Sequence, residues 1–172
     1  MKTEKIPMLA GIVLIILLAF LIVWKADIFG VSGSRLEQDA RERQNVNYDW
    51  EQVQSINDDV CAMLFYDEDR KEYAYSIYLS REGLSYGYFY AEGGADSQMT
   101  EKVKGIVFEE KGIVLLSLNG DEICKVVIDN QNGKETILVD PQKPFAMILP
   151  VTCHEIVMYD EQDNIVTMYD TE

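Results

Sequence analysis

The chain has 172 residues, with 30 Asp and Glu against 15 Lys and Arg, which gives a net charge of −15. A protein this acidic lacks the basic footprint that nucleic-acid phosphates need, so the composition excludes a nucleic-acid partner. Its three cysteines have no CxxC spacing, so they indicate neither a disulfide framework nor a zinc site.

Residues 6–24 are the most informative stretch, because these nineteen residues carry no charge. A helix rises about 1.5 Å per residue, so this run would span roughly 28 Å, close to the hydrocarbon thickness of a bilayer. The run is longer than the apolar part of a signal peptide, and no small-residue cleavage site follows it. We predict a single transmembrane helix over 6–24 that holds the protein in the cell membrane, with residues 1–5 as a cytoplasmic tail.

The orientation of this helix is predicted from flanking charges that are nearly balanced. Lys2 and Lys5 precede the run, and Lys25 and three arginines follow it within about twenty residues. The N-terminal charges are concentrated in five residues, and large C-terminal domains translocate largely regardless of their own charge. The C-terminal domain is therefore expected outside the cytoplasm, and a cytoplasm-facing regulatory domain is the alternative.

Residues 25–57 have the composition of a stalk with short helices. Glycine and serine at 30–34 loosen the exit from the membrane. Ser34 and Glu37 have the spacing of a capping box, which predicts a polar helix through Gln44 with little apolar surface to bury. A second short helix is predicted over 49–56, because apolar residues recur there at every third position.

Residues 58–172 change to the pattern of short strands, rich in Val, Ile, Tyr and Phe and separated by turn residues. The predicted strands are 60–66, 73–79, 84–90, 103–108, 113–118, 123–128, 136–139, 145–149, 155–159 and 165–169. No helical crossover interrupts them. The predicted fold is therefore mostly β: one N-terminal transmembrane helix, one or two short stalk helices and an antiparallel β-sandwich, Ig-like or jelly-roll-like.

One predicted hairpin carries the candidate binding residues. With a loop at 80–83, strands 73–79 and 84–90 pair so that five tyrosines lie on one face. Such a face is either core, with hydroxyl groups reaching the rim, or a flat platform for a peptide or glycan. The platform residues would be Tyr73, Tyr75, Tyr86, Tyr88 and Tyr90.

Candidates for catalysis and metal binding are few. Cys153 and His154 are neighbours in sequence, and in a strand neighbours point to opposite faces, whereas an edge or turn gives a freer geometry; a catalytic thiol–imidazole pair is not expected. Free, buried thiols are expected, with a Cys124–Cys153 bridge as the alternative. Acidic clusters at 58–59, 67–69 and 160–163 fall where turns are predicted, and a structural calcium site is the alternative reading. We predict no cofactor and no metal.

These features together predict a non-enzymatic, membrane-anchored binding or scaffold module. Its β domain would engage a protein partner or an envelope polymer such as a cell-wall glycan. The layout of short basic tail, anchor, stalk and β domain resembles that of small single-pass exported proteins. The alternatives are an envelope enzyme, or accessory enzyme subunit, using a carboxylate cleft, and the cytoplasm-facing regulatory domain.

Overall fold

The computed structural model describes residues 11–18, 20–21, 28–83, 85–96, 102–130 and 133–167. Over these ranges the protein is mostly β, with antiparallel sheets and few helices, as the sequence predicts. The first elements are η1 (Gly33–Arg35), α2 (Leu36–Gln44), β1 (Glu51–Ile56), β2 (Val60–Tyr66), β3 (Tyr73–Leu79) and β4 (Phe89–Asp96). The remaining strands are β5 (Lys104–Phe108), β6 (Gly112–Ser117), β7 (Ile123–Asn130), β8 (Gly133–Leu138), β9 (Phe145–Leu149), β10 (Glu155–Asp160) and β11 (Ile165–Val166).

The predicted transmembrane segment, 6–24, lies partly outside the described residues, as does the whole predicted tail, 1–5. Within the segment, residues 11–18 and 20–21 are helical, and their large apolar side chains are exposed. In the part of the chain that the structure describes, no helix is both long enough and apolar enough to cross a bilayer.

The described strands form three antiparallel sheets. The first sheet has the order β1-β2-β3-β4, a meander in which each strand pairs with its neighbour in sequence. The second has the order β5-β6-β9, and the third has the order β11-β10-β7-β8. The chain therefore leaves the second sheet after β6, makes the β7–β8 hairpin of the third, and returns as β9.

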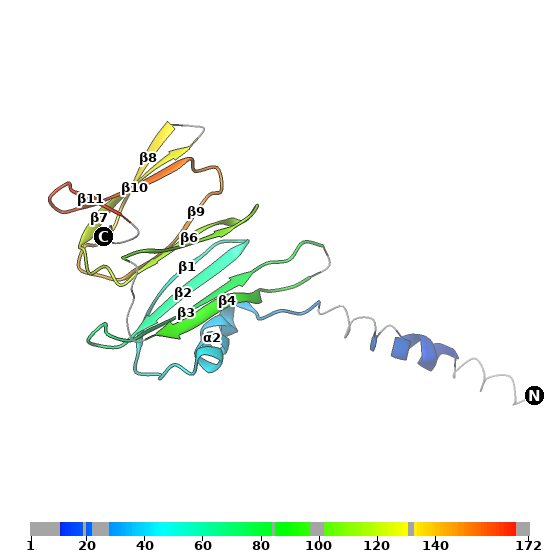
Figure 1. Ribbon diagram of the computed structural model, residues 1–172. Coiled ribbons are helices and arrows are strands. Elements are labelled where there is room, and N and C mark those ends of the chain that lie inside the picture. The colour runs from blue at the N-terminus through cyan, green and yellow to red at the C-terminus, as the bar shows by residue number, and fades with distance from the viewer. Residues whose placement is uncertain are drawn as a thin grey trace, which may run out of the picture.

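The sheets and the helix are stacked in four layers (Figure 1). Helix α2 packs on one face of the first sheet through Leu36 and Ala40. The other face of that sheet packs on the second sheet, where Leu64 and Ile77 meet Val114 and Leu116. A separate apolar cluster joins the opposite face of the second sheet to the third sheet.

This layering explains the continuous apolar runs in the sequence. Strand β2 is buried at every position, because α2 covers one of its faces and the second sheet covers the other. Strand β6 is largely buried for the same reason, since it lies between the first and third sheets. Alternating polar residues are absent from such strands because neither face meets water.

The prediction of a second short helix over 49–56 is wrong, because residues 51–56 form the edge strand β1. They pair with β2 along their full length, from Glu51 opposite Tyr66 to Ile56 opposite Cys61. Only three apolar side chains recur at every third position in this stretch, so the helical pattern was weak. Pairing with the buried strand β2 outweighs so weak a local preference.

The segment predicted as a stalk is packed on the first sheet from Ile28 onward. Phe29 and Val31 form β-bridges with Tyr86 and Tyr88, and α2 buries Leu36 against the sheet. The predicted capping box does not form: α2 begins at Leu36 without a side-chain cap, although it ends at Gln44 as expected. A helix of polar composition can therefore still bury two or three side chains firmly.

The predicted register of the tyrosine hairpin is also wrong. Strand β4 begins at Phe89 rather than at residue 84, and Leu79 pairs with Phe89. A register irregularity follows between Ile77 and Tyr78. Tyr86 and Tyr88, which the prediction paired with β3, form bridges to the N-terminal segment instead.

Candidate functional site

The five predicted platform tyrosines do not share one face. Tyr73 and Tyr75 are buried in the cluster between the first and second sheets. The hydroxyl group of Tyr75 donates a hydrogen bond of 3.1 Å to Glu92 Oε1. Burial, together with the nearby Glu92 carboxylate, raises the pKa of Tyr75 to about 12. These two tyrosines occupy core positions, as the first of the two sequence interpretations expected.

The other three tyrosines lie in or directly after the loop between β3 and β4. Tyr86 is exposed and stacks on Phe29, with ring centroids 6.0 Å apart. Tyr88 donates a hydrogen bond of 2.6 Å to the carbonyl oxygen of Asn57. Tyr90 lies on the α2 side of the sheet, edge-on to Tyr78 at 5.7 Å. Ligand binding by these tyrosines stays a prediction.

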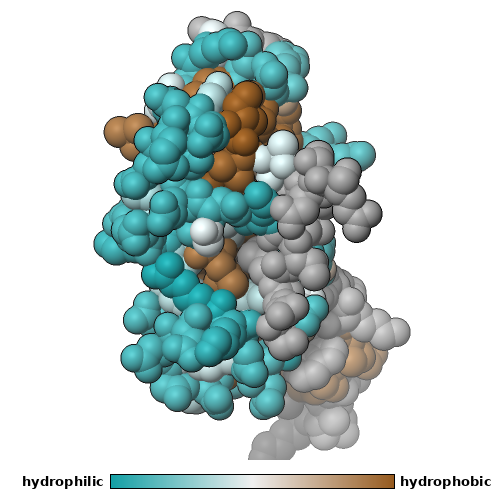
Figure 2. Space-filling view, turned by 60° about the vertical axis from the view of Figure 1, so that its left-hand side comes forward, coloured by the Kyte–Doolittle hydropathy of each residue, from teal (hydrophilic) through white to brown (hydrophobic). Residues whose placement is uncertain are grey.

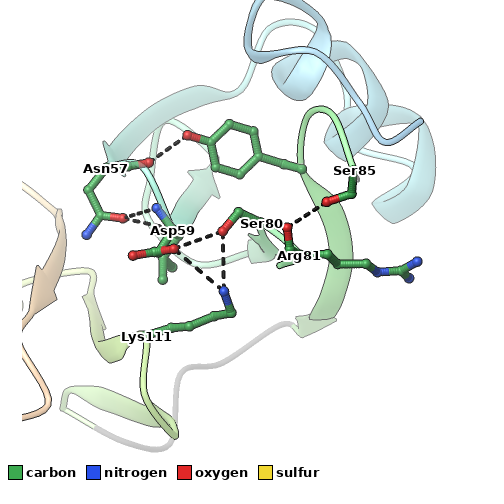
Figure 3. A network of polar contacts seen from close by, with 8 residues as sticks. Asn57, Asp59, Ser80, Arg81, Ser85 and Lys111 are labelled. Atoms are coloured by element: carbon green, nitrogen blue, oxygen red, sulfur yellow. Dashed lines mark hydrogen bonds and ion pairs between the residues drawn. The ribbon is translucent and has the colours of Figure 1, made fainter. Parts of the chain in front are cut away.

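Three turns from the first and second sheets meet in a polar cluster (Figure 3). The β1–β2 turn supplies Asn57 and Asp59, the end of β3 supplies Ser80, and the β5–β6 turn supplies Lys111. Ser80 Oγ donates to Asp59 Oδ1 at 2.9 Å, and Lys111 Nζ donates to Ser80 Oγ at 3.3 Å. Lys111 Nζ also lies 3.6 Å from Asp59 Oδ1. We call these four residues the three-turn cluster.

A serine close to a lysine raises the question of nucleophilic catalysis. An activated serine donates its hydrogen bond to a general base, whereas the acceptor here is the Asp59 carboxylate. The Ser80 hydroxyl donates its proton toward the same carboxylate, which is a weak base. The cluster therefore ties three turns together and does not form an activated nucleophile.

A groove of about 430 Å³ lies beside the three-turn cluster. Its apolar lining comes from the end of β3 and the start of β4, and its charged lining comes from the flanking turns: Leu79, Ser80, Arg81, Glu82, Phe89, Tyr90, Ala91 and Lys111. The guanidinium group of Arg81 stacks 3.8 Å above the ring of Phe89. The charged lining consists of two cations, Arg81 and Lys111, and one carboxylate, Glu82.

A second pocket, of about 340 Å³, separates α2 from the N-terminal segment and contains two carboxylates, Asp39 and Glu42. Burial alone would raise the pKa of Asp39, but hydrogen bonds donated by Tyr78 and Arg43 outweigh it and lower that pKa. A general acid needs a raised pKa. Asp39 is therefore an ionised structural anchor for Tyr78, whose hydroxyl group lies 2.6 Å from it.

The cysteines, the histidine and the acidic turns have structural surroundings. All three cysteines are free thiols, so the alternative of a Cys124–Cys153 bridge is not realised. Cys153 is half-buried and His154 is exposed. Asp67 Oδ1 accepts hydrogen bonds from the backbone of residues 71 and 72, and Asp160 Oδ1 does so from residues 162 and 164. Among the described residues, no three His, Cys, Asp or Glu side chains converge as metal ligands.

The outer face of the third sheet is a further candidate site. Its inner face packs on the second sheet through residues such as Val126, Ile128 and Met158. Side chains alternate along a strand, so Lys125 and Val127 point the other way. The strand register places a mixed group around them on this outer face: Asp129, Lys134, Thr136, Leu138, Glu155, Val157, Tyr159 and Ile165.

This outer face combines exposed apolar side chains with charged groups, because Asp129, Lys134 and Glu155 lie on it beside Lys125. Leu138 is 81% exposed and Ile165 is 64% exposed, on opposite edges of the sheet. Between them Lys125 Nζ lies 4.4 Å above the ring of Tyr159 and bonds Asp163 Oδ1 at 2.7 Å. Figure 2 shows apolar side chains in the upper part of the molecule, the height at which Figure 1 places the third sheet, and a smaller apolar area near its middle, with hydrophilic side chains between them.

No protein-family model matches this chain, and comparisons with curated proteins and with solved structures gave no match either. The site must therefore be judged from its own residues. Sequence reasoning missed both the three-turn cluster and the outer face. The acidic pair at 58–59 is predicted as a turn with a calcium site as the alternative, and neither reading indicates contact with Ser80 or Lys111. The alternation of Lys125, Val127 and Asp129 with buried neighbours was the available signal for the outer face.

Proposed function

We propose that the protein is a non-enzymatic, membrane-anchored binding module whose β-sandwich lies outside the cytoplasm. Residues 6–24 would form its single transmembrane helix. The outer face of the third sheet would receive a protein partner. The observation that carries the proposal is that α2 covers one end of the four-layer stack, while apolar side chains remain exposed at the other.

The anchor has its support in the sequence and in the described helical residues. Nineteen residues without a charge match the thickness of a bilayer. The exposed apolar side chains of residues 11–18 and 20–21 need a nonaqueous environment, which lipid supplies.

The chemistry of the outer face favours a protein over an envelope polymer. Leu138, Val127 and Ile165 offer aliphatic side chains, and such surfaces bind the apolar patches of other proteins. Glycan sites instead rely on polar groups around an aromatic platform, and the predicted tyrosine platform is divided between two faces. The partner should therefore present a complementary apolar patch.

Site-specific photocrosslinking in the membranes of cells that express the full chain tests this proposal. A photoreactive phenylalanine analogue in place of Leu138 should give one discrete protein adduct. The same analogue in place of Tyr48, which is exposed beside α2, should not give that adduct. Identical adducts from both positions would overturn the proposal.

Two variants on β8 serve as matched controls for the docking face. Thr136→Arg places a bulky charge on the outer face and should reduce the Leu138-position adduct several-fold. Glu135→Arg changes the neighbouring exposed residue, which points to the opposite face of the same strand. It should leave the adduct unchanged. Equal effects of the two variants would show that the outer face is not the docking surface.

A further inference from the structure

Phe29 and Tyr86 form an exposed aromatic pair next to the predicted anchor. Their exposed fractions are 67% and 64%, and their rings stack with an interplanar angle of 20°. Four backbone hydrogen bonds of 2.7–2.9 Å hold the segment around Phe29 to the segment around Tyr86. The position of the pair is therefore fixed relative to the first sheet.

The length of chain between the anchor and this pair is short. Phe29 is five positions after Trp24, where the uncharged run ends. An extended chain spans at most about 3.6 Å per residue, so the Cα atoms of Trp24 and Phe29 lie within about 18 Å of each other. The headgroup region of a bilayer is itself roughly 5–8 Å thick on each side. The tether therefore keeps the pair close to the lipid surface.

We propose that the Phe29–Tyr86 pair inserts into the headgroup region of the bilayer and holds the first sheet against the membrane. This inference rests on the proposed anchor. Aromatic residues concentrate at the boundary between lipid and water, where an apolar ring and a polar hydroxyl group are both accommodated. An exposed pair of aromatic rings within reach of the bilayer consists of the residue type that is enriched at this boundary.

The charge of the domain decides how it can approach the lipid. From Ala26 onward the chain has 12 Lys and Arg against 29 Asp and Glu, a net charge of −17. Anionic lipid would repel a broad contact with such a surface. Contact through one aromatic pair avoids this electrostatic repulsion, because the contact depends on apolar insertion and not on the charge of the lipid. The proposed ligand is therefore a bilayer interface with zwitterionic headgroups.

Tryptophan fluorescence of the full chain in phosphatidylcholine vesicles tests the inference, with bromine atoms on the upper acyl chain as quencher. The Trp50→Phe variant keeps Trp24 as the reporter of the anchor. The Trp24→Phe/Trp50→Phe/Phe29→Trp variant reports the pair, at an exposed position that tolerates a larger ring. We expect the emission from position 29 to be quenched clearly, because aromatic side chains of this kind lie at the level of the headgroups.

The control replaces Leu138, on the third sheet, by tryptophan in the same Trp24→Phe/Trp50→Phe background. This position is more exposed than Phe29, at 81% against 67%, and it lies on β8 of the third sheet, beyond the second sheet from the first, so it should show little quenching. If Trp24 is quenched while position 29 matches position 138, the anchor stands and the membrane contact is overturned. If Trp24 itself is not quenched, the proposed anchor and this inference both fail.

Discussion

Arg41 is the residue that joins α2 to the segment leading into β1. Its guanidinium group donates to the carbonyl oxygens of Asn47 and Trp50 at 2.8 Å and 3.1 Å. It also bonds Glu37 Oε1 at 2.9 Å and lies 4.8 Å from the ring centroid of Phe65. A buried arginine with this many partners fixes the turn after α2 more firmly than apolar packing alone could.

Replacing Arg41 should therefore destabilise the fold well beyond an ordinary surface substitution. Arg41→Ala leaves two partly buried carbonyl groups without a donor and removes the cation–π contact, at a cost of about 3 kcal/mol. Arg43→Ala, two residues along the same helix at a half-exposed position, should cost less than about 1 kcal/mol. Urea unfolding measures both free energies, and equal losses would contradict the assigned role of Arg41.

Asp39 gives the protein a stability that depends on pH. Its pKa in the folded state is lower than the ordinary value of 3.8, because the hydrogen bonds from Tyr78 and Arg43 outweigh burial. The unfolded chain then binds more protons than the folded chain near that pH, so stability falls as the pH drops. The contribution is complete above the ordinary pKa and is lost as the pH falls through the lowered folded-state pKa.

Comparison with Asp39→Asn isolates this contribution. The difference in unfolding free energy between the two proteins should be constant at neutral pH and should shrink steadily below about pH 4. Chemical unfolding at a series of pH values from 7 to 3 measures it. A difference that stays the same down to pH 3 would show that Asp39 is not selectively stabilised as the carboxylate.

At the scale of elements, the contact between the N-terminal segment and the β3–β4 loop depends on two glycines. Gly87 has a φ of +86°, and a Cβ there would lie 2.6 Å from the carbonyl oxygen of Val31. Gly30 faces the loop equally closely, since its Cβ would lie 2.5 Å from the Tyr88 carbonyl oxygen. The two backbones can pair because neither residue has a side chain.

Gly87→Ala should detach this segment. Gly83→Ala is the matched control, because Gly83 has a similar φ of +85° but open space around it. Both substitutions cost about 1 kcal/mol from the unfavourable φ, while only Gly87→Ala also clashes with backbone. Hydrogen–deuterium exchange of a peptide covering residues 28–31 should accelerate in Gly87→Ala alone. Similar exchange in both variants would mean that close backbone approach is not what holds the segment.

Strand positions were well predicted from the sequence wherever burial left a clear signal. The runs at 60–66, 73–79 and 145–149 were found with their observed ends, because branched and aromatic residues fill both faces of strands between two layers. The start of β4 could not be found in this way. Tyr86 and Tyr88 have the composition of a strand, and nothing local indicates that the N-terminal segment is their partner.

The candidate sites were harder to predict than the strands, because each one is assembled from distant parts of the chain. The three-turn cluster combines Asp59, Ser80 and Lys111, which are polar turn residues with no distinctive spacing. The burial of Tyr75 depended on which layer covered it, and that layer consists of later strands. Local sequence patterns show the composition and the periodicity of a strand, but they do not show which layers of the fold pack on each other.

At the scale of the whole molecule, the proposed location outside the cytoplasm can be tested with one exposed thiol. In Leu138→Cys, a membrane-impermeant maleimide should label intact cells as strongly as lysed cells. The wild-type chain gives the background from its native thiols, and Cys61 should contribute little, because burial raises its pKa to about 11. Labelling of Leu138→Cys only after lysis would place the domain in the cytoplasm.

The order of the strands has a consequence for how the chain is made. The first sheet is complete once Asp96 has been synthesised, whereas the second sheet lacks β9 until Leu149 appears. A growing chain folds from its N-terminus, so the first sheet can form while the apolar side chains of Leu64 and Ile77 still face solvent. The proposed membrane anchor, once inserted, would hold each nascent chain apart from its neighbours during that interval. The tether would then guard the protein against aggregation before it takes any part in binding.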